Sequence, residues 1–172
     1  MADSLTLRYQ NREVIFEKST KLVAIRARAG MAVRMQADVD RIAVTKGSGH
    51  RQTIGAFEVV ELRPSATGLD QDLDWLRAQP SVAAASHVFF VKGKATLMVP
   101  SGHVELQFDL DLAGHEQQAI LARYRLQAVE HRGQGSYLVS ITSGSKNPLA
   151  TAAALQAEPG IALAEPEFVN PS

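Results

Sequence analysis

The second half of this chain repeats the first, and this repetition limits the folds that the sequence can adopt. The segment from Leu76 to Phe89 reads LRAQPSVAAASHVF, and the segment from Leu155 to Phe168 reads LQAEPGIALAEPEF. Six of the fourteen positions are identical at a constant offset of 79 residues. An ungapped match at one offset is hard to obtain from composition alone, so the sequence predicts a duplicated folding unit.

The repeat extends towards the start of each half. At an offset of 80, Gly55, Phe57 and Val59 match Gly135, Tyr137 and Val139, and residues 14–25 match residues 97–108 at an offset of 83. The predicted units are residues 1–91, a degenerate first repeat, and residues 92–172, a second repeat with a C-terminal tail. A unit of about 80 residues lies near the lower limit of independent stability, so the two units are expected to support each other.

The composition is that of an ordinary globular protein and excludes several functions. Eighteen basic residues balance eighteen acidic residues among the 172, so no positive field draws the chain to nucleic acid or to an anionic membrane. The absence of cysteine excludes disulfides and thiol catalysis. The sequence shows neither a signal peptide nor a long apolar run, so we expect the chain as given to be neither exported nor membrane-spanning, with a cytoplasmic location as the working expectation.

Apolar alternation and turn residues predict the elements of the first unit. We expect a hairpin, a strand, an ambiguous segment with weak helical character, a strand, a helix capped by an aspartate, and a strand that turns back at a glycine. The corresponding segments are Leu5 to Phe16, Leu22 to Ala27, Met31 to Val44, Phe57 to Leu62, Asp70 to Arg77, and Val82 to Val91 with its return over Ala95 to Val99.

The second unit has a clearer pattern. Its predicted order is strand, helix, strand, strand, helix, strand, which is the ferredoxin-like arrangement. The segments are Val104 to Leu110, Gly114 to Tyr124, Leu126 to His131, Tyr137 to Ile141, a helix that Asn147 caps before Pro148, and Ile161 to Phe168. The fold class is therefore predicted as α+β, with two tandem ferredoxin-like (βαββαβ) units. We expect antiparallel sheets with helices on one face, each unit being introduced by a β-hairpin strand.

Two segments carry a resemblance to a known family. The stretch from Ala152 to Phe168 resembles the end of the propeptide of subtilisin-like serine proteases, where a helix, a proline-glycine turn and a final strand rich in Glu-Pro precede the mature enzyme. The stretch YQNREVIFEKSTKLVAIRA, from Tyr9 to Ala27, looks like the hairpin that opens the prodomain of fervidolysin-type subtilases.

This resemblance implies a non-catalytic chain that inhibits a subtilisin-like protease and assists its folding. The propeptide of that family presses its sheet against the protease and lays its C-terminal tail along the active-site cleft. Carried over residue by residue, the resemblance assigns the cleft contacts to Glu165, Pro166, Glu167, Phe168, Val169, Asn170, Pro171 and Ser172. An extended tail on a rigid domain suits this role, because the domain reduces the cost of ordering the tail.

The first unit departs from the family pattern. It has Ser86-His87 where the second unit has Glu165-Pro166, and it continues into another strand, so we expect it not to occupy a cleft. The protease domain either follows in the same gene product or is inhibited in trans. Two other classes of function stay open: a ferredoxin-like small-molecule sensor with a ligand between the units, and a structural adaptor that associates through sheet edges.

The remaining motifs do not indicate chemistry. The five histidines lack metal-ligand spacing, and His115-Glu116 lacks the second histidine of the zinc-protease motif because position 119 is Ala119. The carboxylates Asp109, Asp111 and Glu116 are explained by a solvated strand end beside a helix N-terminus. Ser143 to Lys146 fits S-x-x-K without its companion motifs. We expect no metal, no cofactor and no catalytic residue, and the alternative for the C-terminal segment is an ordinary last strand with a frayed end.

Overall fold

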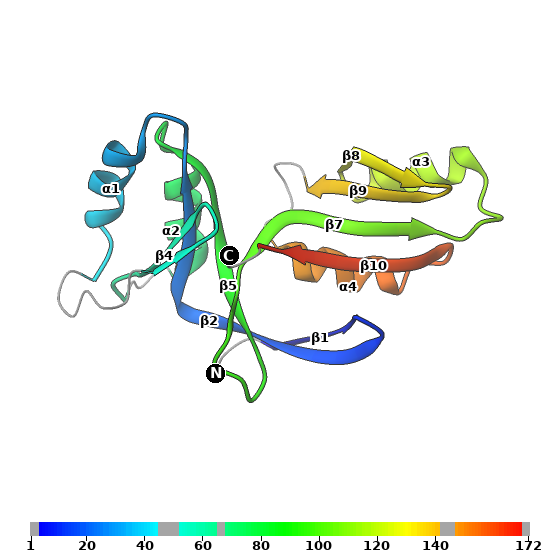
Figure 1. Cartoon of the computed structure of the whole chain (residues 1–172), viewed down its shortest axis with the longest axis horizontal. Coiled ribbons are helices and arrows are strands. Elements are labelled where there is room, and N and C mark those ends of the chain that lie inside the picture. Colours follow the sequence, from blue (N-terminus) through cyan, green and yellow to red (C-terminus); the bar gives the residue numbers. More distant parts are fainter. Residues whose placement is uncertain (1–3, 45–51, 65–67, 142–146, 170–172) are drawn as a thin grey trace.

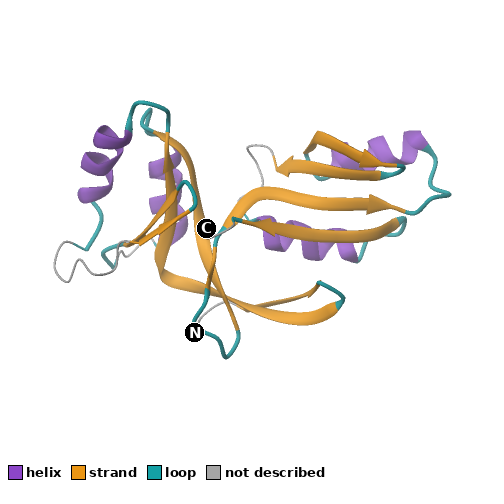
Figure 2. Ribbon diagram, in the orientation of Figure 1, coloured by secondary structure: helices purple, strands orange, loops and turns teal. Residues whose placement is uncertain are grey.

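The computed structural model describes residues 4–44, 52–64, 68–141 and 147–169. Within these ranges the chain forms four helices and two antiparallel sheets (Figures 1 and 2), which confirms the α+β class. Each half of the chain contributes one sheet and two helices. None of the helices in these ranges is long and apolar enough to cross a bilayer.

The first sheet is built around one long strand. Its strands are β1 (Ser4–Tyr9), β2 (Arg12–Ala27), β3 (Gln52–Ile54), β4 (Phe57–Glu61), β5 (Val82–Val91) and β6 (Leu97–Met98). The order is β3-β4-β2-β5-β6, and β1 pairs with the first part of β2. The two strand segments predicted between residues 14 and 27 are thus one strand, because β1 and then β4 pair with its successive parts.

Two helices, α1 (Ala32–Asp40) and α2 (Leu69–Arg77), cover one face of this sheet. Met35 and Val39 of α1 and Leu73 and Leu76 of α2 pack in one buried cluster with Val23 and Ile25 of β2. The ambiguous segment after Gly30 is therefore a short helix. Its apolar stripe is narrow because only two of its nine residues are buried.

The second sheet has four strands in the order β10-β7-β9-β8. These are β7 (Pro100–Phe108), β8 (Leu126–Gly133), β9 (Ser136–Ile141) and β10 (Ile161–Phe168), with helices α3 (Gly114–Arg123) and α4 (Pro148–Gln156). The core lies between the helices and one sheet face, and it contains Leu106, Phe108, Val139 and Leu155. Tyr137, Val139 and Ile141 all face this core, as their alternation predicts.

The internal repeat is visible in the structure. Helices α2 and α4 begin 79 residues apart, as do strands β5 and β10. Leu76 and its repeat partner Leu155 are fully buried in the first and second cores respectively. Identical residues in the repeat therefore occupy equivalent packing positions. The boundary predicted after residue 91 falls in the turn from β5 to β6, and β6 still belongs to the first sheet.

The two predicted helix caps have different outcomes. Asn147 caps α4, since its Oδ1 accepts from the backbone N–H groups of Leu149 and Ala150 at 3.1 and 3.2 Å, and Pro148 takes the first helical position. The prediction for Asp70 is wrong, because Gly68 is the N-cap of α2 and Asp70 lies within its first turn. The Asp70 carboxylate instead contacts His87, and a long-range contact of this kind is not visible in the local sequence.

The β1–β2 hairpin reaches from the first half to the second. It lies beside α4 and β10 in Figure 1, and Leu7 and Phe16 share a buried cluster with Phe89 of β5 and Leu149 of α4. Phe168 packs against this cluster, with its ring centroid 5.5 Å from that of Phe16. We call this cluster the junction. Its two repeat-related phenylalanines, Phe89 and Phe168, meet at one place.

Candidate functional site

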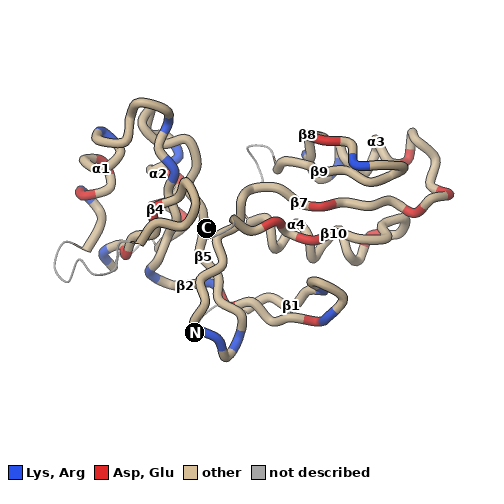
Figure 3. The backbone as a smooth tube through the Cα atoms, in the orientation of Figure 1, with Lys and Arg blue, Asp and Glu red and all other residues tan. Residues whose placement is uncertain are grey.

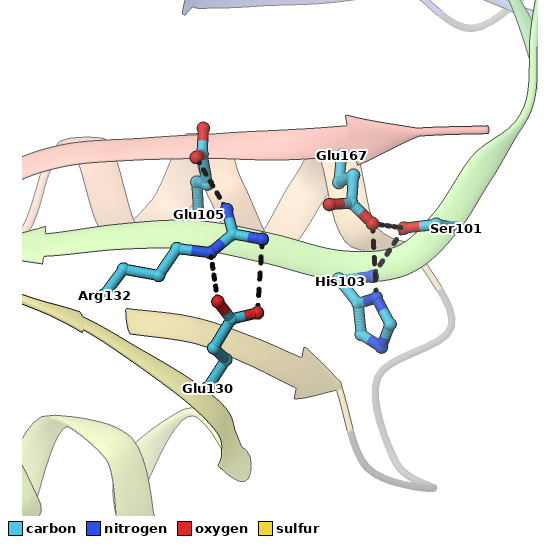
Figure 4. Close-up of polar contacts among 6 residues, drawn as sticks. All are labelled: Ser101, His103, Glu105, Glu130, Arg132 and Glu167. Carbon is cyan, nitrogen blue, oxygen red and sulfur yellow. Dashed lines mark hydrogen bonds and ion pairs between the residues drawn. The ribbon is translucent and has the colours of Figure 1, made fainter. Parts of the chain in front are cut away.

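The face of the second sheet opposite its helices carries a cluster of polar side chains. On β7, Val104, Leu106 and Phe108 point into the core, so His103 and Glu105, at alternate positions, lie on the other face. We call this surface the open face. It also carries Ser101, Glu130, Arg132 and Glu167, and Figure 4 shows these six side chains together.

Carboxylates dominate the charge of the open face. Glu165 lies opposite Glu105 in the β10–β7 ladder, and cross-strand partners share a sheet face. Figure 3 shows acidic residues along β7, β8 and β10. Arg132 forms ion pairs with Glu105 and Glu130 in this group. Four glutamates therefore stand around one arginine and one histidine, which gives the open face a negative potential.

Arg132 of β8 joins two of these glutamates. Its Nη1 lies 2.9 Å from Glu105 Oε1, and its Nε lies 3.4 Å from Glu130 Oε1 (Figure 4). The hydrogen bond with Glu130 raises the pKa of the Arg132 guanidinium above its ordinary value, and the charges of Glu130, Glu105 and Glu167 add to this effect. These contacts hold the exposed guanidinium beside two carboxylates, which partly neutralise its charge.

Ser101, His103 and Glu167 form a second group at the end of β7. The Ser101 hydroxyl donates to Glu167 Oε1 at 2.9 Å, and His103 Nδ1 lies 3.3 Å from the same oxygen. In a catalytic triad, the serine hydroxyl donates to the histidine, and the acid orients the opposite ring nitrogen. Here both groups converge on one carboxylate oxygen, so this geometry does not activate Ser101 as a nucleophile.

The structure divides the eight residues predicted to lie in a protease cleft. Glu165 and Glu167 are on the open face, and Pro166 is buried on the other side of β10. Phe168 belongs to the junction, and Val169 packs against a cluster on the first sheet. Asn170, Pro171 and Ser172 lie outside the described residues.

The chain remains attached to the fold as far as Val169. Its N–H donates to the Val99 carbonyl at 2.8 Å, one residue beyond the end of β10. Phe168 and Val169 are partly buried against these clusters. Either side chain would have to leave its cluster in order to contact a protease cleft. Among the described residues of this segment, Glu165 and Glu167 lie on the open face and can reach a partner without such a change.

The remaining residues of the open face were not predicted. The signal lies in the alternation of β7, where His103, Glu105 and Gln107 separate the three core residues. This alternation could indicate that β7 has a polar face. It could not indicate which side chains contact His103 and Glu105, because Arg132 and Glu167 come from other strands whose positions are set by the fold. The motif at Ser143 to Lys146 lies outside the described residues.

Elsewhere in the described ranges, few clusters of side chains could bind a metal or carry out chemistry. No group of three or more His, Asp or Glu side chains there could hold a metal ion. The tip of the β1–β2 hairpin reaches the edge of the acidic surface, since the Gln10 N–H donates to Glu165 Oε1 at 2.7 Å. Burial raises the pKa of the nearby Tyr9 hydroxyl, and the charges of Glu165 and Glu105 raise it further.

Comparisons with protein-family models, curated proteins and solved structures gave no match to this chain. Its function must therefore be inferred from its own residues.

Proposed function

We propose that this chain is a non-catalytic binding module that inhibits a subtilisin-like serine protease and assists its folding. In this proposal each half is a ferredoxin-like unit, and the second unit contacts the protease. The open face docks on the enzyme, and the chain after Val169 enters the active-site cleft. The protease acts either as a following domain of the same polypeptide or as a separate molecule.

The observation that carries this proposal is the arrangement of the second sheet. The strand order β10-β7-β9-β8 with both connecting helices on one face leaves the other face open to a partner. Strand β10, the last of the chain, is an edge strand that carries Glu165 and Glu167 on that open face. A partner that covers the open face therefore also lies next to the segment leaving β10.

The acidic character of the open face supports a complementary partner surface. Carboxylates bind well to helix N-termini and to basic side chains. Glu105, Glu130 and Glu167 present such groups within one surface that Arg132 and His103 hold in place. In this proposal the sheet docks on the protease, and Asn170, Pro171 and Ser172 occupy its active-site cleft.

The decisive experiment is an inhibition assay with a purified broad-specificity subtilisin-like protease and a peptide substrate. We expect the full chain to inhibit competitively, and a chain ending at Val169 to inhibit at least about tenfold more weakly, since tail contacts are lost. The truncation removes no residue of the described fold, so circular dichroism should show the same content of helix and strand.

Charge reversal separates the two parts of the proposal. Glu105→Lys combined with Glu167→Lys should weaken inhibition by slowing association and should change its salt dependence. The matched control is Glu116→Lys on the exposed side of α3, which should inhibit like the wild type. Full protease activity in the presence of a micromolar excess of wild-type chain would contradict the proposal.

A further inference from the structure

A groove runs between the hairpin of the first half and the edge of the second sheet. It has a volume of about 710 Å³ and lies between β1 on one side and β10 with the end of α4 on the other. This volume is within the range of roughly 300–1,000 Å³ that is typical of ligand sites. Its lining includes the small side chains of Ala153 and Ala157 on α4 and Ala162 on β10, which we call the alanine floor, beside the larger Leu7, Ile161 and Leu163.

Both walls of the groove are strand edges that direct main-chain groups into it. The N–H and C=O of Arg8 both bond to the side chain of Gln156 and so point away from β2. Because these groups alternate between the two edges of an antiparallel strand, Thr6 also directs its N–H and C=O into the groove. On the opposite wall, the carbonyl of Ala164 points into the groove and accepts from Gln156.

Gln156 occupies one position between these edges in a way that imitates a peptide group. Its Nε2 donates to the carbonyls of Arg8 and Ala164, both at 2.7 Å, and its Oε1 accepts from the Arg8 N–H at 2.9 Å. A side-chain amide has the same donor and acceptor chemistry as the main chain. One amide contacts both edges, so a single amide group spans the gap between the two strands at this position.

We propose that this groove binds an extended peptide segment of a partner protein, which lies between β1 and β10 as an additional strand. Main-chain hydrogen bonds to the two edges hold the peptide, and its alternate small or medium apolar side chains lie on the alanine floor. The Gln156 side chain swings out, and the peptide replaces its three hydrogen bonds. This groove adjoins the open face at Glu165, and peptide binding in it does not depend on protease inhibition.

The lining suggests which peptides the groove prefers. Arg8 and Arg12 are balanced by Glu13 and Glu165, so the groove carries no net charge that would select an acidic or a basic peptide. Recognition therefore depends on an extended main chain and on side-chain size. Proline at positions that pair with the edges should be excluded, because it lacks the N–H that these positions require.

The test uses the full chain and a phage-displayed library of random peptides of about eight residues, roughly the length of one strand. Selected peptides are synthesised and titrated by fluorescence anisotropy. We expect Ala157→Trp, which fills the floor from an exposed position, to weaken binding at least about tenfold, and Gln156→Ala to strengthen it by removing the competing amide. The matched control is Ala154→Trp, at an exposed α4 position that does not line the groove, and it should leave the affinity within about twofold.

Two further measurements report on main-chain pairing itself. N-methylation of every second residue of a selected peptide should weaken binding in both registers, because successive N–H groups of an inserted strand point to opposite edges and each register removes the pairing with one edge. Hydrogen exchange should show new protection at the Thr6 amide, with little change at Leu7, whose amide already faces β2. Failure to enrich any peptide over an unrelated control protein, equal binding to Ala157→Trp, or indifference to N-methylation in both registers would each overturn the proposal. If Gln156→Ala fails to fold, the comparison of Ala157→Trp with Ala154→Trp still tests whether the peptide binds in the groove.

Discussion

At the scale of single residues, His87 is one of the two buried polar residues in the described ranges. Its side chain is 5% exposed, and its Nε2 lies 2.7 Å from Asp70 Oδ1. Nδ1 is buried and has no hydrogen-bond partner in the described structure. Burial lowers the pKa of the imidazole. The hydrogen bond to Asp70 opposes this shift, and the charge of Lys18 reinforces it. The neutral ring with its proton on Nε2 is thus the form that fits.

The stability of the protein should therefore fall in acid. Because the folded-state pKa of His87 lies below its ordinary value of 6.5, the unfolded chain binds the additional proton first. Stability is retained above about pH 6.5 and is lost progressively as the pH falls from there to the folded-state pKa. Urea unfolding at a series of pH values measures this slope. It should decrease in His87→Gln and persist in the control His115→Gln, an exposed side chain on α3. An unchanged slope in His87→Gln would show that another group is responsible.

Gly160 is the second residue whose identity the structure explains. It has a φ of +91°, a region that residues with a side chain rarely adopt, and an added Cβ would lie 3.0 Å from the Leu112 side chain. We expect Gly160→Ala to lower the free energy of unfolding by about 1–3 kcal/mol. Gly30→Ala is the matched control, since its φ is +77° and its Cβ would meet no atom, so it should cost less. Equal losses in the two variants, measured by urea unfolding, would show that the contact with Leu112 has no effect.

At the scale of elements, helix α4 depends on a cap that the sequence predicts. Replacement of Asn147 by alanine removes the acceptor for two helix N–H groups and should cost about 1 kcal/mol, whereas Asn147→Asp should preserve most of the stability. Thermal unfolding monitored by circular dichroism measures both. Because α4 contacts the hairpin as well as its own sheet, the loss should also reduce hydrogen-exchange protection in β1. A stable Asn147→Ala protein would mean that packing alone fixes the start of the helix.

The elements were predictable where the signal is local. Alternation identifies β9, and Asn147-Pro148 identifies the start of α4, because both patterns reflect the chain's own periodicity or capping chemistry. The continuity of β2 was not predicted, since residues 17–21 are polar or charged. Glu17 and Lys18 pair with β5, and pairing with β4 begins at Leu22. The open face was missed for a related reason. Its glutamates, Arg132 and His103 come from three strands, β7, β8 and β10, which only the pairing of the sheet brings together.

At the scale of the whole molecule, the repeat predicted two units but not their contact. Phe89 and Phe168 are identical positions of the repeat, and sequence alone gives each a place in its own unit. In the structure both lie in the junction, together with Phe16 from the hairpin, and the Tyr9 ring lies 5.9 Å from that of Phe16. The hairpin belongs to the first half, and its strand β1 contacts α4 and β10 of the second half. This contact should help to stabilise two units that are each close to the lower size limit.

The junction should make the two halves unfold as one. Phe16 is fully buried there and contacts residues of both halves, so Phe16→Ala should cost about 3–5 kcal/mol and also remove much of the coupling between them. Calorimetry should give a single two-state transition for the wild type, with a calorimetric to van't Hoff enthalpy ratio near 1, and a ratio clearly above 1 for Phe16→Ala. The control is Phe108→Ala in the second core, where the side chain is equally buried. It should lower the melting temperature to a similar extent while keeping one transition, because the junction is intact. Two transitions in the wild type would show instead that the hairpin contact couples the halves too weakly to unite them.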